Sequence, residues 1–317
     1  MKILLLEPIH EDARELLAGV GEVVAAERVD ADYLVIAIAD AAAALTRGYG
    51  RLPRAVLAAG RSLRCVARCG VGTDNIDVEA ATELRIPVIY APGSTTATVA
   101  EHALMLMLAV ARRAARLDRE VKAGDWAVRE RIGLGTELNG KTLGVLGLGD
   151  IGRRVAELGQ AFGMRVIYWS RASRDDRFEF AEHDELLRAA DVLSVNVALN
   201  AETRGLLNRE RLALMKPSAI VVNTARGDVI DEAALYDALS SGRLAGAGLD
   251  VIASDSPRHH NPLWTLDSVV ITPHVAALTD VTYRAMCLTT AGQVARVLRG
   301  EAPDARLVRN PSVLTAG

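Results

Sequence analysis

One glycine-rich turn restricts the fold of this chain more than any other feature. An apolar run, residues 142–146, leads into Gly147-Leu148-Gly149-Asp150-Ile151-Gly152, and an amphipathic pattern then continues to about Ala161. This order predicts a strand, a tight turn and a helix. Glycines let the backbone turn sharply and let an anion approach its N–H groups, and the helix N-terminus adds a positive dipole. The pattern is therefore typical of a pyrophosphate-binding turn.

The position of the turn predicts two domains, because a domain's length of chain precedes it in a sequence of 317 residues. Short apolar runs alternate with helical patterns on both sides of the turn. Before it we expect strands at Ile3–Leu6, Val23–Ala25, Leu34–Ile38, Cys65–Ala67 and Val88–Tyr90. From the turn onward we expect them at Leu143–Leu146, Val166–Trp169, Val192–Val195, Ile220–Asn223, Ala247–Leu249 and Val269–Ile271.

Helical patterns fill the intervals between these strands. We expect a long helix from Thr96 or Thr98 to beyond Leu108, and others at Ile151–Ala161, Arg209–Leu214, Asp231–Ser241 and Val281–Leu298. Apolar strands alternating with helices predict an α/β fold with two doubly wound parallel-sheet lobes. Because the last helix follows the second strand series, we expect it to return to the first lobe. The expected domains are 1–97 and 285–317 for that lobe, and 98–284 for the nucleotide-binding lobe.

Composition excludes several functional classes. Half of the residues are apolar but only 4% are aromatic, so the core must be aliphatic. A formal net charge of −3 predicts no binding to nucleic acid or to a membrane surface. From the sequence we expect no disulfide framework among Cys65, Cys69 and Cys287, no leader and no membrane-spanning segment. We therefore expect a soluble cytoplasmic protein in which Cys65 and Cys69 are buried. We expect no metal site, since His259 and His260 lack ligand spacing.

The strand after the glycine turn ends in a basic segment. An NAD site usually has Asp or Glu here, about 20 residues beyond the turn, to bind the ribose hydroxyls. This chain has Ser170, Arg171 and Arg174 instead. A hydroxyl and guanidinium groups can bind a 2′-phosphate through charge-assisted hydrogen bonds. We therefore predict that NADP(H) is preferred and NAD(H) possible; the alternative is a solvated basic loop.

Three later segments carry groups of complementary chemistry, namely Arg226, Asp255 and His274. Arginine can bind a carboxylate and polarise an adjacent carbonyl, and a histidine backed by a carboxylate can donate and accept a proton. Ligands of open α/β sheets collect at the carboxyl ends of strands, so these residues can converge. Each residue alone also has a structural interpretation. Arg226 can pair with Asp228, Asp255 can belong to an acidic surface loop, and His274 can be part of a Pro-His turn.

From its first strand to about Leu298, the chain resembles the D-isomer-specific 2-hydroxyacid dehydrogenase family. The resemblance rests on ordered motifs: Arg68-Cys69-Gly70-Val71-Gly72-Thr73-Asp74-Asn75-Ile76-Asp77, Val99-Ala100-Glu101-His102, the glycine turn, residues 202–207, residues 223–227, Leu249-Asp250-Val251, residues 261–264 and Thr272-Pro273-His274. It implies a Rossmann nucleotide-binding domain inserted into a flavodoxin-like substrate domain. It also implies a homodimeric NAD(P)-dependent oxidoreductase for small 2-oxo or 2-hydroxy acids.

The resemblance also implies roles for individual residues. Arg226 would hold the substrate carboxylate and carbonyl, helped by the backbone N–H groups of Val71 and Gly72. His274 would be the acid/base, with Asp255 as its catalytic partner. The cofactor would contact Gly147, Gly149, Asp150, Ile151, Gly152, Ser170, Arg171, Arg174, Val197, Ala198, Thr203, Thr224, Ala225, Asp250, His274 and Ala276.

The chain departs from the family's pattern at four places. Asp255 stands where the family has a glutamate and is one methylene shorter. Asn196-Val197-Ala198 replaces His-x-Pro, and Asp150 occupies a position where a basic residue is common. The fourth departure is that the acidic ribose-binding residue is missing, which supports the expected preference for NADP(H).

These observations favour the reduction of glyoxylate or hydroxypyruvate, because NADPH pools favour reduction. One alternative is 3-phosphoglycerate dehydrogenase, with Arg47 and Arg51 as candidate phosphate contacts. An alternative of another class is a non-enzymatic nucleotide-sensing scaffold or co-repressor, since the fold also occurs in such proteins. Trp126 is expected to pack at a subunit contact or in the core.

Overall fold

The computed structural model describes residues 1–253 and 261–314 and divides into two compact units. Unit 1 consists of Met1–Thr95 and Leu278–Gly317, and unit 2 of Thr96–Ala277. The boundary expected after residue 284 falls inside α11 (Asp280–Leu298), a continuous helix. Thr279 caps that helix by accepting from the Thr282 N–H at 3.3 Å, so the chain enters unit 1 before the helix begins.

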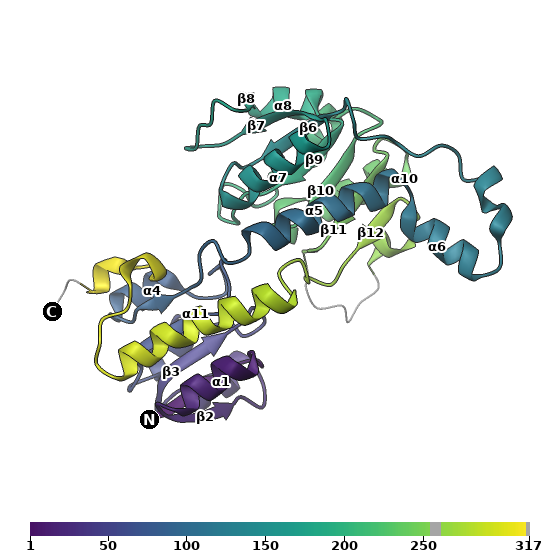
Figure 1. Cartoon of the computed structure of the whole chain (residues 1–317). Helices are drawn as coiled ribbons and strands as arrows, with labels where there is room; N and C mark the ends of the chain where they lie inside the picture. The colour runs from purple at the N-terminus through teal and green to yellow at the C-terminus, as the bar shows by residue number, and fades with distance from the viewer. Residues whose placement is uncertain (254–260, 315–317) are drawn as a thin grey trace. The chain divides into compact units, whose positions relative to one another are not determined.

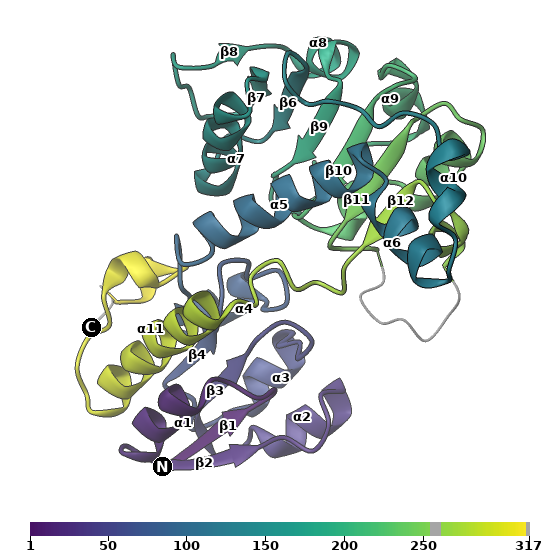
Figure 2. The same cartoon turned by 45° about the vertical axis from the view of Figure 1, so that its right-hand side comes forward.

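Unit 1 is a doubly wound parallel sheet. In its described residues five strands pair in the order β2-β1-β3-β4-β5, which is the flavodoxin-like order. The strands are β1 (Lys2–Leu5), β2 (Glu22–Ala25), β3 (Ala41–Thr46), β4 (Cys65–Arg68) and β5 (Val88–Ile89). One face carries α1 (Glu11–Ala18) and α11, which lie side by side (Figure 1). The other face carries α2 (Ala31–Ala37), α3 (Arg54–Ala59) and α4 (Val78–Glu83) (Figure 2). The returning C-terminal helix thus completes the first unit, as the sequence predicts.

The strand predicted at Leu34–Ile38 is wrong, because this segment lies in α2. Asp30 caps the helix by accepting from the Tyr33 N–H at 3.1 Å. Leu34 and Ile38, four residues apart, are fully buried, whereas Ile36 is exposed, so the apolar spacing is helical. The strand instead follows at β3, whose alanine-rich sequence has helical propensity but is buried between β1 and β4.

Unit 2 has the Rossmann arrangement. In the described part of this unit seven strands pair in the order β12-β11-β10-β9-β6-β7-β8. The sheet contains β6 (Thr142–Leu146), β7 (Arg165–Trp169), β8 (Glu179–Phe180), β9 (Val192–Val195), β10 (Ile220–Asn223), β11 (Gly246–Leu249) and β12 (Val269–Ile271). Strand order reverses between β9 and β6, which is the switch point at which such sheets bind ligands. The predicted α/β fold of two parallel-sheet lobes is confirmed; apart from Leu34–Ile38, the predicted strands are present with ends within one residue.

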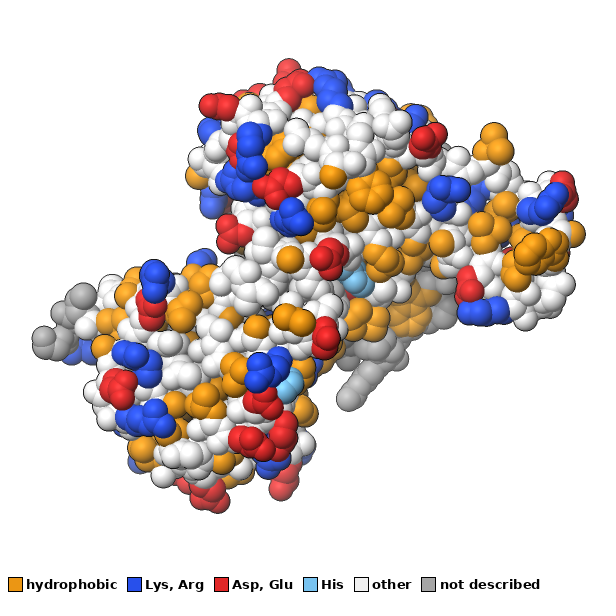
Figure 3. Space-filling model, in the orientation of Figure 1, with side chains coloured by type: hydrophobic (Ala, Val, Ile, Leu, Met, Phe, Trp, Pro, Cys, Tyr) orange, Lys and Arg blue, Asp and Glu red, His pale blue; other side chains and the backbone are white. Residues whose placement is uncertain are grey.

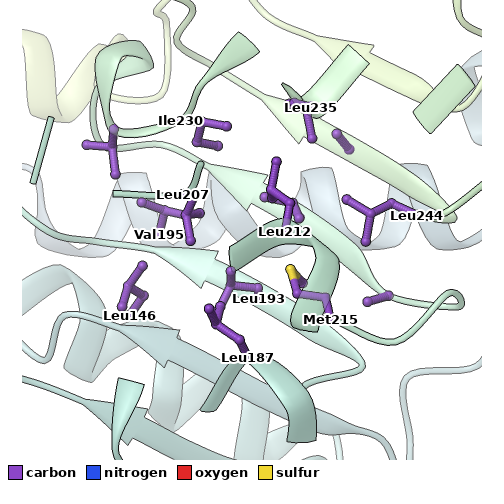
Figure 4. Close-up of a cluster of buried hydrophobic side chains, with 14 of the residues drawn as sticks. Leu146, Leu187, Leu193, Val195, Leu207, Leu212, Met215, Ile230, Leu235 and Leu244 are labelled. Atoms are coloured by element: carbon purple, nitrogen blue, oxygen red, sulfur yellow. The ribbon is translucent and has the colours of Figure 1, made fainter. Parts of the chain in front are cut away.

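Helices cover both faces of this second sheet (Figure 2). One face carries α5 (Thr96–Ala111) and α7 (Asp150–Ala161); the other carries α8 (His183–Ala189), α9 (Arg209–Leu214) and α10 (Glu232–Ser240). Strand residues alternate between the two cores: Val221 packs toward α8–α10, whereas Ile220 and Val222 pack toward α5 and α7. Figure 4 shows the first of these aliphatic clusters. The remaining helical segments are α6 (Ala114–Lys122), η1 (Trp126–Glu130), η2 (Gly227–Val229) and η3 (Pro262–Thr265) in unit 2, and η4 (Ala305–Leu307) and η5 (Pro311–Leu314) in unit 1.

Candidate active site

The strands of unit 2 end in register along one edge of the sheet. Trp169 pairs with Leu146, Leu146 with Val195, and Val195 with Asn223. Asn223 pairs with Leu249, which pairs with Ile271. Because all of these strands are parallel, the segments that follow them leave the sheet at the same edge. Every unit 2 site residue predicted from the sequence and described by the structure lies in one of these segments.

The glycine turn follows β6 and opens α7. Gly147 has φ of +102°, and a Cβ there would lie 2.9 Å from the carbonyl of Asn196. A Cβ on Gly152 would lie 2.0 Å from the carbonyl oxygen of Gly147, so helix and strand can approach this closely only with glycine. A Cβ on Gly149 would meet nothing within 4 Å, and no side chain caps the helix. The first-turn N–H groups, including those of Asp150 and Ile151, therefore have no capping side chain, and such a helix N-terminus suits a pyrophosphate.

The segment after β7 contains the predicted phosphate-reading residues. The buried Ser170 hydroxyl accepts from the Ser173 N–H at 3.2 Å. Arg174 donates to the carbonyl oxygens of Ser170 and Ser173, and its guanidinium carbon lies 4.1 Å from the centre of the Phe180 ring. Arg171 is exposed and paired with Glu202. The guanidinium of Arg171 is therefore less constrained than that of Arg174. Glu202, whose pairing with Arg171 the sequence did not reveal, would compete with a 2′-phosphate for Arg171.

The loop after β9 is held by its own side chains. Thr203 is buried; its hydroxyl donates to the carbonyl oxygen of Ala198 at 2.6 Å and accepts from the Asn200 N–H at 2.8 Å. The Asn200 side chain in turn accepts from the Thr203 N–H at 3.1 Å. These bonds place Val197 and Ala198 on the edge next to the glycine turn, where Val197 lies against Gly147. Asn196, which stands where the resemblance implies histidine, donates to Ser194.

Asn223, the last residue of β10, shapes the turn that presents Arg226. Its side-chain oxygen accepts from the Ala225 N–H at 3.0 Å, and its amide donates to the carbonyl oxygen of Arg226 at 2.9 Å. The Arg226 guanidinium donates to the carbonyl oxygen of Ala225 at 2.7 Å, and the side chain is half-buried. Thr224 and Ala225 lie in the same turn. The arginine is thus held near the sheet edge by backbone hydrogen bonds.

Asp250, the residue after β11, organises the turn that carries His274. Its carboxylate accepts from the Val275 N–H at 2.9 Å and the Ala276 N–H at 3.0 Å, and its carbonyl oxygen accepts from the His274 N–H at 2.8 Å. His274 has φ of +54°, which is unfavourable for a residue other than glycine, and these bonds hold it there. Both carboxylate oxygens of Asp250 thus bind protein donors, and its predicted contact with the cofactor stays a prediction.

The charge of Asp250 is stabilised despite its burial. Only 1% of the residue is exposed, and burial alone would raise the pKa of this carboxyl. Hydrogen bonds from His102, Thr272, Val275 and Ala276 outweigh that effect and lower the pKa. Asp250 is therefore a carboxylate around neutral pH, and it keeps the turn 272–276 fixed.

Arg226 and His274 leave the sheet from strands separated only by β11. Neighbouring strands are about 4.8 Å apart, so the two turns begin roughly 10 Å from each other. Such a spacing lets two long side chains reach one small molecule. Asp255, the third predicted catalytic residue, lies outside the described residues. The chain leading to it is fixed at Ala253, whose N–H donates to Glu232 at 2.5 Å, a contact that sequence reasoning missed.

In unit 1 the predicted carboxylate-binding residues Val71 and Gly72 follow β4 and are half-buried. Their N–H groups donate to no acceptor among the described residues of the unit, so they are available to an anion. A second loop at this edge, residues 46–50 after β3, wraps the Glu7 carboxylate. Glu7 accepts from the N–H groups of Arg47, Gly48, Tyr49 and Gly50 and from the Thr46 hydroxyl. Sequence reasoning missed Glu7, although Glu-Pro directly after a strand was visible.

Three further observations concern possible metal sites, membrane-spanning helices and the cysteines. Residues 1–253 and 261–314 contain no group of three or more His, Cys, Asp or Glu side chains arranged to hold a metal ion. Across the same ranges, no helix combines the length and apolar character needed to span a bilayer. The predicted burial of Cys65 and Cys69 is confirmed; Cys287 is buried as well, and all three are free.

A doubly wound sheet with an uncapped helix N-terminus behind a G-x-G-x-x-G turn defines a dinucleotide-binding domain. The model of the family described as "D-isomer specific 2-hydroxyacid dehydrogenase, NAD binding domain" matches residues 104–276. The chain belongs to this family, so the resemblance found in the sequence is confirmed, and its cofactor class is a nicotinamide dinucleotide.

Individual relatives support the assignment. The chain is 41% identical to D-3-phosphoglycerate dehydrogenase of Methanocaldococcus jannaschii over 99% of its length, but spans only 60% of that relative. It is 38% identical to glyoxylate reductase of Pyrococcus furiosus, covering 95% of this chain and 94% of the relative. Among solved structures, an NADPH-dependent glyoxylate/hydroxypyruvate reductase from Sinorhizobium meliloti, in complex with NADP and malonate, superposes with a TM-score of 0.86 and 32% identity, covering 93% of this chain and 92% of that one.

Proposed function

We propose that this protein reduces a small 2-oxo acid, glyoxylate or hydroxypyruvate, with a preference for NADPH. The observation that carries the proposal is the placement of Arg226 and His274 on the same sheet edge as the open N-terminus of α7. The edge thus joins a cation for a carboxylate, a group that transfers protons, and a site for pyrophosphate. Two relatives bear the corresponding names, and one of their structures holds NADP with the dicarboxylate malonate.

The residues divide the reaction between them. The bound cofactor supplies a hydride from its nicotinamide ring to the C2 carbon of the oxo acid. Arg226 binds the substrate carboxylate and polarises the C2 carbonyl, and the N–H groups of Val71 and Gly72 bind the same carboxylate. His274 donates a proton to the carbonyl oxygen as the alcohol forms, and accepts it in the reverse direction. Asp255 keeps its proposed role as the carboxylate that supports the imidazolium.

The preference for NADPH rests on the segment after β7. Arg171 is the exposed cation there and exchanges Glu202 for a 2′-phosphate when NADPH binds, while Ser170 and Arg174 shape the loop. No carboxylate stands among residues 170–174 to repel that phosphate. The cofactor also contacts the glycine turn and the edge residues Val197, Ala198, Thr203, Thr224, Ala225, Asp250 and Ala276. NADH remains a weaker alternative substrate.

A second candidate function is the oxidation of 3-phosphoglycerate. The identity to phosphoglycerate dehydrogenase favours it, although the chain spans only part of that relative. The two arginines predicted to contact a substrate phosphate, Arg47 and Arg51, have different surroundings. Arg47 is engaged with the Pro8 carbonyl at 3.1 Å and lies 5.1 Å from the centre of the Tyr283 ring, whereas Arg51 is exposed. Arg51 is therefore the better candidate for a substrate phosphate.

We also propose that the protein is a homodimer through the segment around α6 and η1. None of the residues of α6 is buried, and Trp126 in η1 is 73% exposed. Leu134 and Val121 are further exposed apolar residues of this segment. Hydrophobic side chains gather at the right of Figure 3, on the side where Figure 1 places α6. Such a surface is typical of a protein–protein contact. Sedimentation of wild type and Trp126→Ala tests it: the variant should dissociate at concentrations where wild type is dimeric.

The activity is tested by following NADPH and NADH oxidation with glyoxylate, hydroxypyruvate and 3-phosphohydroxypyruvate. We expect the highest kcat/KM with NADPH and one of the two unphosphorylated acids. The highest value with 3-phosphohydroxypyruvate, lowered selectively by Arg51→Ala, would establish the second candidate. Failure to oxidise either cofactor with any 2-oxo acid, despite dinucleotide binding, would favour the non-enzymatic scaffold.

A further inference from the structure

His102 belongs to a sequence motif, Val99-Ala100-Glu101-His102, that the proposed function does not use. It lies on α5, which packs on the face of β10, β11 and β12. Only 16% of its side chain is exposed. The ring Nε2 lies 2.9 Å from the Thr272 hydroxyl and 3.4 Å from the Asp250 carboxylate. The imidazole thus faces Thr272, which begins the turn carrying His274, and Asp250, which binds that turn.

The number of protons on each group determines which residue donates and which accepts in the contacts among His102, Thr272 and Asp250. The Thr272 hydroxyl has one proton, and the Asp250 carboxylate can only accept. The hydroxyl therefore donates to Asp250, at 2.6 Å, and must accept from His102. This requires a proton on Nε2 of His102, so His102 serves as the donor whether its ring is neutral or charged.

The same contacts reach His274 through the backbone. Asp250 accepts from three successive N–H groups, those of His274, Val275 and Ala276. They hold His274 in a backbone conformation that non-glycine residues disfavour. Without His102, the Thr272 hydroxyl loses the donor that fixes its orientation toward Asp250. The carboxylate would then be freer to rotate and would hold the N–H groups of Val275 and Ala276 less firmly.

We propose that His102 is a positioning residue for the reaction, acting through Thr272 and Asp250 to hold the turn 272–276 and with it the His274 imidazole. The role rests on the proposed function, since it assigns His274 to proton transfer. His102 itself touches neither substrate nor cofactor in this scheme. A displacement of reacting groups by about 1 Å can slow a reaction on the order of 100-fold, so a loose turn has a measurable consequence.

The test compares three variants. His102→Leu keeps apolar volume but removes the donor, and His102→Gln restores an N–H donor on a side chain of similar reach. Glu101→Gln, an exposed neighbour on the same helix, is the matched control. We expect His102→Leu to lower kcat roughly 10- to 100-fold with little change in the KM for NADPH. His102→Gln should recover most of the rate, and Glu101→Gln should match wild type.

Two further readouts separate positioning from a general loss of structure. With C4-deuterated NADPH, the primary isotope effect should rise in His102→Leu, because the chemical step becomes more nearly rate-limiting. Amide hydrogen exchange of residues 272–276 should accelerate in that variant and return toward wild type in His102→Gln. Unchanged kcat in His102→Leu, or unchanged exchange of this turn, would overturn the inference even if the wild type is an active reductase. If the wild type reduces no 2-oxo acid, the proposed function fails, and the exchange measurement still decides whether His102 holds the turn.

Discussion

The two units share one architecture but fix their functional loops differently. In unit 2, strand-end side chains bind the turns that follow at the same edge: Asn223 closes its own turn, and Asp250 binds the turn after β12. In unit 1, a single carboxylate from the end of β1, Glu7, collects the N–H groups of the loop after β3. Unit 2 thus distributes the positioning among several strand-end residues, whereas in unit 1 one carboxylate accepts from four N–H groups of the loop, with Asn75 binding the Gly50 carbonyl oxygen at 2.8 Å.

This difference predicts a division of labour. Redundant contacts suit groups that must keep the same geometry for every substrate, such as those for hydride and proton transfer. A loop whose N–H groups share one acceptor can change its side chains without disturbing the sheet, and this suits recognition of a variable substituent. Substitutions in unit 2 should therefore reduce turnover or change cofactor choice, whereas substitutions in the Glu7 loop should change substrate affinity.

The largest expected effect is at His274. We expect His274→Ala to lower kcat by roughly 10²–10⁴, because the proton donor is lost, while NADPH still binds. The measurements are steady-state rates and NADPH fluorescence titration. His274→Asn is the matched variant: asparagine tolerates a positive φ but cannot transfer the proton. Activity retained in His274→Asn but lost in His274→Ala would show that the backbone, not the imidazole, is what the reaction needs.

The next effect concerns cofactor choice. We expect Arg171→Asp to lower the ratio of kcat/KM for NADPH to that for NADH by about 10- to 100-fold, equivalent to one charge-assisted hydrogen bond of roughly 1.5–3 kcal/mol. Glu202→Gln removes the ion-pair partner of Arg171 and should raise the same ratio. An unaltered ratio in both variants would mean that the 2′-phosphate is read elsewhere.

A third prediction concerns stability and its pH dependence. Asp250→Asn places an amide donor against backbone donors, which should cost about 1–3 kcal/mol of unfolding free energy at pH 7. Because hydrogen bonds lower the pKa of Asp250 in the folded state, its contribution is fully present above the unfolded pKa of about 3.9. The contribution is lost as the pH falls through the lower folded pKa. Thermal unfolding measured as a function of pH should therefore show that the difference in unfolding free energy between wild type and Asp250→Asn becomes smaller below about pH 4. A difference that does not change with pH would mean that the charge of Asp250 does not stabilise the fold.

The sequence predicted most of this architecture because the decisive signals are local. Apolar runs, the glycine turn and the strand order of a βαβ series identify both sheets, and the motif order identifies the family. Leu34–Ile38 was mistaken for a strand because β-branched residues obscured an i, i+4 spacing. β3 was missed because its alanines are buried by neighbours that propensity does not consider.

The site was only partly predictable, for a related reason. Arg226 and His274 were found because each ends a predicted strand. Glu202, Glu232, His102 and Glu7 were missed as contributors because each acts on a segment distant in the sequence, from 21 residues for Glu232 and Ala253 to 170 for His102 and Thr272. Such partnerships depend on which strand ends become neighbours, and no local pattern encodes that.

The smallest expected effect falls in unit 1 and tests the division of labour directly. Glu7→Gln keeps the side chain's shape but removes the charge that four backbone N–H groups share. Weakening charged hydrogen bonds by about 1 kcal/mol should raise the KM for the 2-oxo acid roughly fivefold. The NADPH dissociation constant should not change, because the loop belongs to the unit without the glycine turn. Glu11→Gln, an exposed neighbour at the start of α1, is the control and should leave both constants unchanged. Equal changes in KM and in NADPH affinity would show that the two units do not divide recognition in this way.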